Sequence, residues 1–286
     1  MQQPLAYQLP DFLESSEGRP IRLLAEYLEP LRRLREQKIQ DTVVFFGSAR
    51  VNSLERARRA LQTLSSRGVE GAAEHYEEEL KRSRKAVEWA RYYEEARELA
   101  HMLTTWSLSL GSENHRFVVT SGGGPGIMEA ANRGASEAGG KTVGLNIRLP
   151  YEQDANRYIS EDLQFEFHYF FMRKFWFAYL AAAIVVFPGG FGTCDEIFEI
   201  LTLAQTDKLS KRTDVILYGR EYWTQVLNLE PMVEWGAIAE KDLSLLHYAD
   251  TPDEAFQYLR EHLVVNHLQP PTAQETRAPG IAVTKG

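Results

Sequence analysis

The chain has 286 residues, of which 44% are hydrophobic and 25% charged, so it is long enough to bury a core and is expected to form one large domain. A formal net charge of -8 and the lack of any lysine- or arginine-rich block argue against a nucleic-acid or anionic-membrane surface, because such partners need a basic surface. An anionic ligand would therefore have to be held by a few local groups.

The single cysteine, Cys194, excludes an intramolecular disulfide bond, and we expect it to be a small filler residue rather than a nucleophile. The histidines are scattered, which predicts no metal site. The first residues show no basic segment followed by an apolar run, and no stretch approaches the length of a membrane span. We therefore expect a cytoplasmic protein that binds neither membrane nor nucleic acid.

Apolar runs alternate with helical segments along most of the chain. Leucine and isoleucine follow a helical spacing in residues 19–39, and a continuous apolar run follows at residues 42–46. Four more runs of this kind are separated by helical segments, at residues 116–121, 141–147, 182–187 and 214–218. Strands that are apolar throughout and alternate with helices indicate an α/β, Rossmann-like fold, a doubly wound parallel sheet with helices on both faces.

Glycine-rich loops follow three of these predicted strands, at Gly47 and Ser48, at residues 122–126 and at residues 189–193. In sheets of this class, ligands bind beyond the carboxyl ends of the strands. We therefore expect the three loops to converge on one pocket.

Two segments do not fit the alternating pattern. Residues 52–89 are highly charged, with pairs such as Glu78 and Arg82 at helical i,i+4 spacing, and they lengthen the first crossover. We interpret them as a solvent-exposed helical insertion, with a cover over the active site or an oligomer contact as alternatives. Residues 269–286 lack periodicity and are expected to be a disordered tail after a single domain of residues 1–268.

The sequence PGGFGTCDE, residues 188–196, places a glycine-rich turn between an apolar strand and a predicted helix. Glycines let the backbone approach a ligand closely, and the free N–H groups at a helix start attract an anion. The turn is therefore a candidate phosphate site. It lacks the Gly-Lys-Ser/Thr of a Walker loop, and residues 122–129 do not match the spaced glycines of the dinucleotide fingerprint.

The same residues also have purely structural interpretations, which the sequence leaves open. Thr193 and Glu196 fit the T-x-x-E pattern of a capping box. Residues 122–124 fit a tight strand-to-helix turn. Arg173 and Lys174 begin an otherwise apolar helix, where such charges are usually solvated.

Five blocks in this order resemble the family named after the plant protein Lonely Guy, often mislabelled as lysine decarboxylases: FFGSAR, VVTSGGGPGIMEAANRGASEAGG, VGLNIRLPYEQ, FFMRKFWF and PGGFGTCDE. The pattern P-G-G-x-G-T-x-x-E is highly specific. The resemblance runs from about residue 42 to about residue 218 and is interrupted by the insertion. After the insertion, residues 91–103 resemble the first core helix of the family.

The resemblance implies hydrolysis, without a cofactor, of the N-glycosidic bond of a nucleoside 5'-monophosphate, such as AMP or an N6-modified AMP of the cytokinin type. The products would be a free base and ribose 5-phosphate. Catalysis would fall to Arg173 and Glu196. We expect Arg173 to pair with Glu196 and with the sugar-phosphate, orienting the carboxylate and keeping it ionised. The substrate-binding residues would be Gly47, Ser48, Gly122, Gly123, Gly124, Gly126, Met128, Glu129, Lys174, Gly189, Gly190, Gly192 and Thr193.

Several points stay open at this level. Glu196 fits either a base that activates water or a stabiliser of the oxocarbenium-like transition state. Glycosidases usually employ two carboxylates; Asp195 points about 100° away from Glu196 around the helix, which leaves Glu199 and Glu129 as candidates.

Two rival functions also remain. A non-catalytic carrier of a nucleotide or of the molybdenum cofactor would use the same glycine loops without hydrolysis. A lysine decarboxylase would need a lysine for pyridoxal phosphate, and we find none in a convincing context. Because members of the resembling family commonly form homodimers, we expect a homodimer or a higher homo-oligomer.

Overall fold

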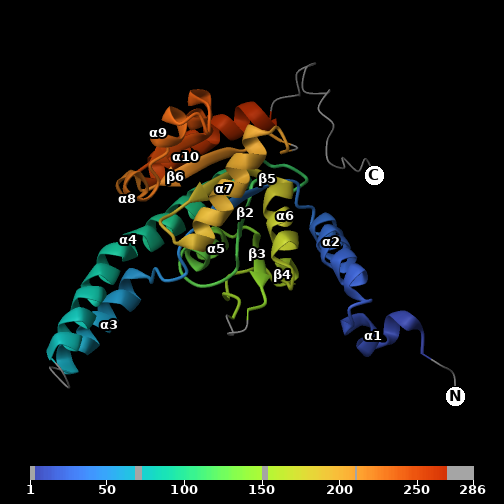
Figure 1. Cartoon of the computed structure of the whole chain (residues 1–286), viewed down its shortest axis with the longest axis horizontal. Helices are drawn as coiled ribbons and strands as arrows, with labels where there is room; N and C mark the ends of the chain where they lie inside the picture. Colours follow the sequence, from blue (N-terminus) through green and yellow to red (C-terminus); the bar gives the residue numbers. More distant parts are fainter. Residues whose placement is uncertain (1–3, 68–72, 150–153, 210, 269–286) are drawn as a thin grey trace.

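The computed structural model describes residues 4–67, 73–149, 154–209 and 211–268, and the expected disordered tail lies outside them. These residues form a seven-stranded sheet of order β4-β3-β2-β1-β5-β6-β7, in which all neighbouring strands are parallel (Figure 1). The strands are β1 (Thr42–Phe46), β2 (Val118–Ser121), β3 (Thr142–Ile147), β4 (Gln164–Phe167), β5 (Ala181–Val186), β6 (Asp214–Tyr218) and β7 (Leu246–Ala249). The predicted α/β, Rossmann-like parallel fold is confirmed.

The five predicted strands correspond to β1, β2, β3, β5 and β6, which are buried along almost their whole length. In β1, Val43 and Phe45 pack on one face of the sheet, and Val44 and Phe46 pack on the other. The edge strands β4 and β7 are absent from the prediction. Exposed and buried residues alternate in β4 and β7 is mostly half-buried, so neither contains a fully buried apolar run.

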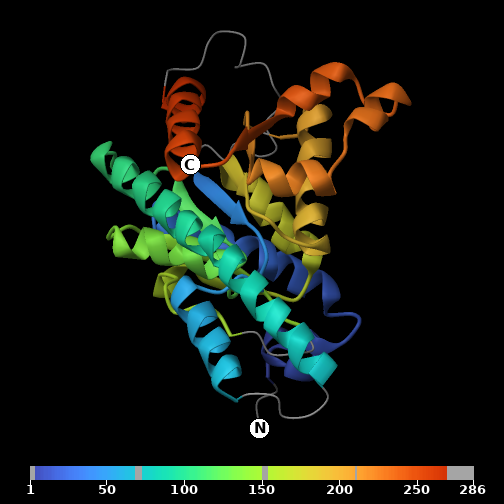
Figure 2. The same ribbon diagram turned by 90° about the vertical axis from the view of Figure 1, so that its left-hand side faces the viewer.

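Helices cover both faces of the sheet (Figures 1 and 2). One face packs against α4 (Ala73–Ser109), α5 (Ile127–Glu137) and α10 (Pro252–Leu263). The other packs against α2 (Arg19–Glu36), α6 (Phe170–Leu180), α7 (Phe191–Gln205) and α8 (Arg220–Val226). The short helices α1 (Pro10–Glu14) and α9 (Glu230–Glu234) lie outside these layers. Among the described residues, we find no helix with the length and apolarity that crossing a membrane requires.

The charged insertion is helical, as expected, and consists of α3 (Leu54–Arg67) and the beginning of α4. The predicted ion pair between Glu78 and Arg82 is present at 3.4 Å. Helix α4 extends beyond the insertion, however. It is 37 residues long in all, roughly 55 Å, and its second half buries Leu99 and Leu103 against the sheet. We call α3 and the part of α4 before residue 90 the helical arm; it projects from the body of the molecule (Figure 1).

The strand order fixes where a ligand can bind. The chain leads from β1 outward to β4 on one side of the sheet and from β5 outward to β7 on the other, so the winding reverses between β1 and β5. Such a switch point leaves a crevice beyond the carboxyl ends of the two strands. The glycine-rich loops after β1 and β5 lie at this crevice.

Candidate active site

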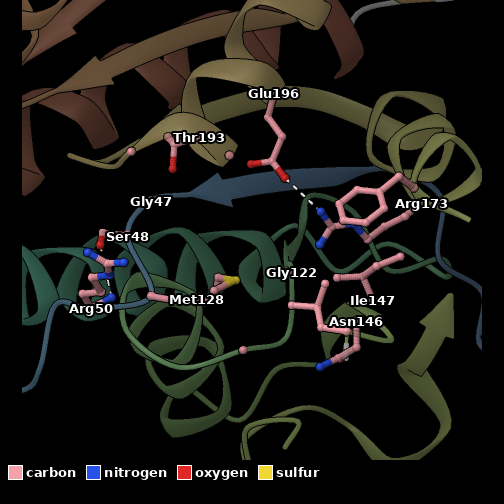
Figure 3. A pocket seen from close by; sticks show the side chains of 16 residues that line it. Gly47, Ser48, Arg50, Gly122, Met128, Asn146, Ile147, Arg173, Thr193 and Glu196 are labelled. Atoms are coloured by element: carbon pink, nitrogen blue, oxygen red, sulfur yellow. Dashed lines mark hydrogen bonds and ion pairs between the residues drawn. The ribbon is translucent and has the colours of Figure 1, made fainter. Parts of the chain in front are cut away.

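A cavity of about 280 Å³ opens at the carboxyl ends of β1, β2, β3 and β5 (Figure 3). All three glycine-rich loops line it, so their predicted convergence is confirmed. The described lining residues are Gly47, Ser48, Ala49, Arg50, Gly122, Gly124, Met128, Asn146, Ile147, Leu149, Phe170, Arg173, Gly190, Gly192, Thr193 and Glu196.

The loop after β1 is tied to both neighbouring turns. Ser48 N donates to Pro188 O at 3.0 Å, and Ile127 N donates to Ser48 O at 3.2 Å. Gly126 has φ +73°, and a Cβ there would overlap Ser48 O, so this close approach requires glycine. The contacts hold the β1 loop between the first turns of α5 and α7.

The start of α7 differs from the capping-box interpretation. Its N-cap is Gly190, with no side-chain cap hydrogen bond, and the first intrahelical bond runs from Cys194 N to Gly190 O at 3.0 Å. Thr193 and Glu196 therefore lie inside the helix and do not cap it. Because the N–H groups of a first helical turn have no intrahelical acceptor, they are available to an anion in the cavity.

Arg173, from α6, and Glu196, from α7, meet at the wall of the cavity (Figure 3). Arg173 Nη2 lies 3.5 Å from Glu196 Oε1, and the side chains are only 12% and 14% exposed. The Nε of Arg173 is buried with no hydrogen-bond partner among the described residues. The expected ion pair is therefore present but long, and it leaves hydrogen-bonding capacity on the guanidinium.

Burial raises the pKa of Glu196 to about 7, although Arg173 and Lys174 act to lower it. Burial also lowers the pKa of Arg173. Arg173 thus favours the ionised form of Glu196, as expected, but desolvation of the carboxylate outweighs its attraction, so Glu196 is only partly ionised near neutral pH. A carboxyl group with a pKa near 7 is present in both protonation states at neutral pH, which suits proton transfer.

Some residues expected at the site lie outside the described lining: Gly123, Gly126, Glu129, Lys174 and Gly189. Lys174 Nζ contacts Asp195 at 2.7 Å and Glu199 at 3.1 Å, so this lysine engages both acids. Glu129 accepts a hydrogen bond from Tyr93 Oη at 2.7 Å. Among the described lining residues, Glu196 is the only acid.

The cavity also contains residues absent from the sequence-based prediction. Arg50 uses its backbone in hydrogen bonds with Ser48 and Asn52, but its guanidinium contacts no carboxylate of the described residues. The Phe170 ring lies 5.4 Å from the Arg173 guanidinium. Asn146 Oδ1 is buried without a hydrogen-bond partner in the described part of the chain. The sequence position of Arg50 could have indicated its place in the site, because it follows Ser48 by two residues in the loop after a predicted strand.

The donor set suits an anion better than a metal or an imine-forming cofactor. The described residues contain no group of three or more His, Cys, Asp or Glu that could hold a metal ion. No lysine lines the described cavity, and hydrogen bonds to Asp195 and Glu199 raise the pKa of nearby Lys174 despite its burial, whereas a Schiff-base lysine needs a lowered pKa. Burial likewise raises the pKa of the Cys194 thiol, which disfavours a nucleophilic role.

Comparison with solved structures finds similar chains at low identity. The X-ray structure of the structural-genomics target TM1055 is 22% identical and covers 77% of this chain and 99% of that one, with a TM-score of 0.45. The Moco carrier protein of Chlamydomonas reinhardtii is 22% identical and covers 61% of this chain and 89% of that one, with a TM-score of 0.41. Scores this low say nothing about function, and the fold assignment rests on the sheet described above.

Comparison with protein sequences finds a similar relative and a partial match to a family model. The "probable cytokinin riboside 5'-monophosphate phosphoribohydrolase LOG6" of Arabidopsis thaliana is 25% identical over 146 residues, which are 51% of this chain and 72% of the relative. The profile of a family described as "possible lysine decarboxylase" matches residues 128–259, from the start of α5 into α10. The matched residues include the P-G-G-F-G-T turn, Arg173 and Glu196, and over this part of the chain the protein is similar to that family.

Proposed function

We propose that the cavity hydrolyses the N-glycosidic bond of a nucleoside 5'-monophosphate and releases the free base and ribose 5-phosphate. The observation that carries the proposal is Glu196, a buried carboxyl group with a pKa of about 7, placed one helical turn beyond a helix start whose N–H groups suit an anion. The activity in the printed name of the Arabidopsis relative is of the same class.

The 5'-phosphate would lie on the N–H groups at the start of α7. Arg173 is engaged by Glu196 and Lys174 by two other acids, whereas Arg50 reaches the cavity with no carboxylate partner among the described residues. Arg50 is therefore the cation that we assign to the phosphate. In a chain with a net charge of -8, such a local group is needed to hold an anion.

Glu196 lies roughly 6 Å along the helix axis from Gly192, at a rise of 1.5 Å per residue. This spacing matches the reach from a 5'-phosphate to the ribose ring. In the reaction, a water oxygen bonds to C1' as the C1'–N bond breaks; the base leaves with the bonding electrons and takes up a proton. The Glu196 carboxylate would stabilise the positive charge on the ribose or accept the proton of the attacking water.

The rest of the cavity supplies an apolar surface for the base. Met128, Ile147 and Phe170 line it beside the polar groups. An aromatic ring next to Arg173 suits the stacking of a flat base, and we take AMP or an N6-modified AMP as the substrate class.

The test is a release assay across AMP, GMP, CMP, UMP, IMP and isopentenyl-AMP, with chromatographic detection of the free base and of ribose 5-phosphate. We expect equimolar release of both products from at least one adenine nucleotide. Tight binding of a nucleotide without any release would instead favour the carrier function.

A further inference from the structure

Gly189, the first glycine of the P-G-G-F-G-T turn, is held from outside the cavity by a tyrosine. Tyr222, on α8, donates its hydroxyl hydrogen to Gly189 O at 2.8 Å. From the neighbouring position on the same helix, Trp223 Nε1 donates to Val186 O, at the end of β5, at 3.1 Å. Helix α8 therefore fixes both the last residue of the strand and the beginning of the turn that follows it.

The geometry of the peptide bond gives this contact a consequence inside the cavity. The Gly189–Gly190 peptide is trans, so the carbonyl of Gly189 and the N–H of Gly190 point in opposite directions. With the carbonyl held by Tyr222 on one side, the N–H of Gly190 is directed to the other side, where Gly190 lines the cavity. Because neither glycine has a Cβ, no side chain of its own restricts the orientation of this peptide.

The helical arm contacts the same tyrosine. The Trp89 ring, on α4, meets the Tyr222 ring edge to face, with centroids 5.5 Å apart and planes at 88°. On the same side, the Tyr92 ring packs edge to face against Trp89 at 6.3 Å. The base of the arm thus braces the side chain that holds the Gly189 carbonyl.

We propose that Tyr222 is a positioning residue that directs the Gly190 N–H toward the substrate's phosphate, and that Trp89 connects the helical arm to this turn through Tyr222. The inference rests on the proposed function for its substrate, but it makes a separate claim about anion binding. It gives the arm a role in the site without placing any residue of the arm in the cavity.

The test compares Tyr222→Phe with the unaltered protein. Loss of the hydroxyl should raise KM for AMP and the Kd for inorganic phosphate by about 5- to 10-fold, because the N–H donor is no longer held in place, while kcat changes less than about 2-fold. Tyr92→Phe is the matched control. It removes a hydroxyl from the same cluster that accepts from Arg91 at 2.8 Å and does not contact the turn, so both constants should stay unchanged.

Trp89 is tested in a double-mutant cycle. Trp89→Ala alone should raise the Kd for phosphate by about 3-fold, and it should add nothing in the Tyr222→Phe background, because it acts through the tyrosine. Calorimetric titration with inorganic phosphate provides a readout that needs no turnover, so a protein that releases no base refutes the proposed function and still tests this inference. Equal phosphate affinity of Tyr222→Phe and the unaltered protein, or no phosphate binding by the latter, would overturn it.

Discussion

Glu196 lies at a position where an ionised carboxylate is unfavourable and has one guanidinium nearby to offset that cost. If its charge serves the reaction, Glu196→Gln should lower kcat by roughly 100-fold or more, the usual scale for removal of a general acid or base. AMP affinity should persist, since the phosphate contacts that we propose come from Arg50 and the backbone at the start of α7. Steady-state kinetics, calorimetry and thermal unfolding on this variant give the three quantities.

Glu199→Gln is the matched control, because Glu199 lies on the same helix but pairs with Lys174 outside the cavity. It should retain near-normal turnover. A folded Glu196→Gln protein that binds AMP and turns it over at the normal rate would remove Glu196 from the chemistry.

The raised pKa of Glu196 predicts the pH dependence of the rate. The carboxylate form is the active one in the proposed reaction, and this form becomes the major one as the pH rises above the pKa of about 7. Activity should therefore rise with pH through about 7 and level off above it. The residual activity of Glu196→Gln should lack this inflection, whereas any inflection from the phosphate group of AMP remains in both proteins. A rate that falls as the pH rises through 7 would assign Glu196 to an acid role.

Arg50 is the residue whose role in binding is easiest to isolate. Arg50→Ala should raise KM for AMP by about 10-fold with little change in kcat, because it removes a contact that is the same in the ground state and the transition state. Arg50→Lys should restore part of the affinity. Arg59→Ala, on the exposed face of α3, serves as the control and should behave like the unaltered protein. An unchanged KM in Arg50→Ala would place the phosphate elsewhere.

At the scale of elements, the sequence predicts the interior strands and the helices of the arm. It does not predict features that depend on how one element packs against another. The five interior strands are predictable because they are buried on both faces and hence apolar throughout, whereas β4 and β7 have one partly exposed side. The charged pairs of the arm predict helices, but nothing in them marks where α4 passes from solvent onto the sheet. The T-x-x-E pattern of α7 resembles a cap because sequence cannot locate the helix start at Gly190.

The candidate site is likewise predicted in part. The glycine loops, Arg173 and Glu196 follow from motif and topology. The direction of the pKa shift of Glu196 cannot be predicted in this way, because it depends on how deeply α6 and α7 bury the carboxyl group. The engagement of Lys174 by Asp195 and Glu199 also needs the relative placement of the two helices.

The arm offers a prediction at this scale. Leu54 N donates to Glu94 Oε1 at 3.0 Å, so α3 begins beside the second half of α4 and the two helices run antiparallel toward the tip. Removing residues 64–82 and joining the ends with a short Gly/Ser linker should leave a folded protein with near-normal kcat and KM, because Trp89 and Tyr222 remain in contact. A longer deletion that includes Trp89 should raise KM. Loss of activity in a folded tip deletion would make the tip part of the site.

At the scale of the whole molecule, the doubly wound sheet places the crevice between β1 and β5, and the sequence places glycine loops at that crevice. The protein carries a net charge of -8, so the positive potential that the proposed anionic substrate requires would come from the guanidinium groups of Arg50 and Arg173 and from the start of α7. Formation of a homodimer stays a prediction, to be checked by light scattering.

In the proposed reaction, these groups bind the phosphate while Glu196 acts on the ribose. The most direct measurement is kcat/KM for base release from AMP and from adenosine, which differ only in the 5'-phosphate. We predict that AMP is hydrolysed at least about 100-fold more efficiently, because adenosine lacks the contacts with Arg50 and the first turn of α7 and so loses that binding energy. Comparable values of kcat/KM for the two substrates would contradict the account.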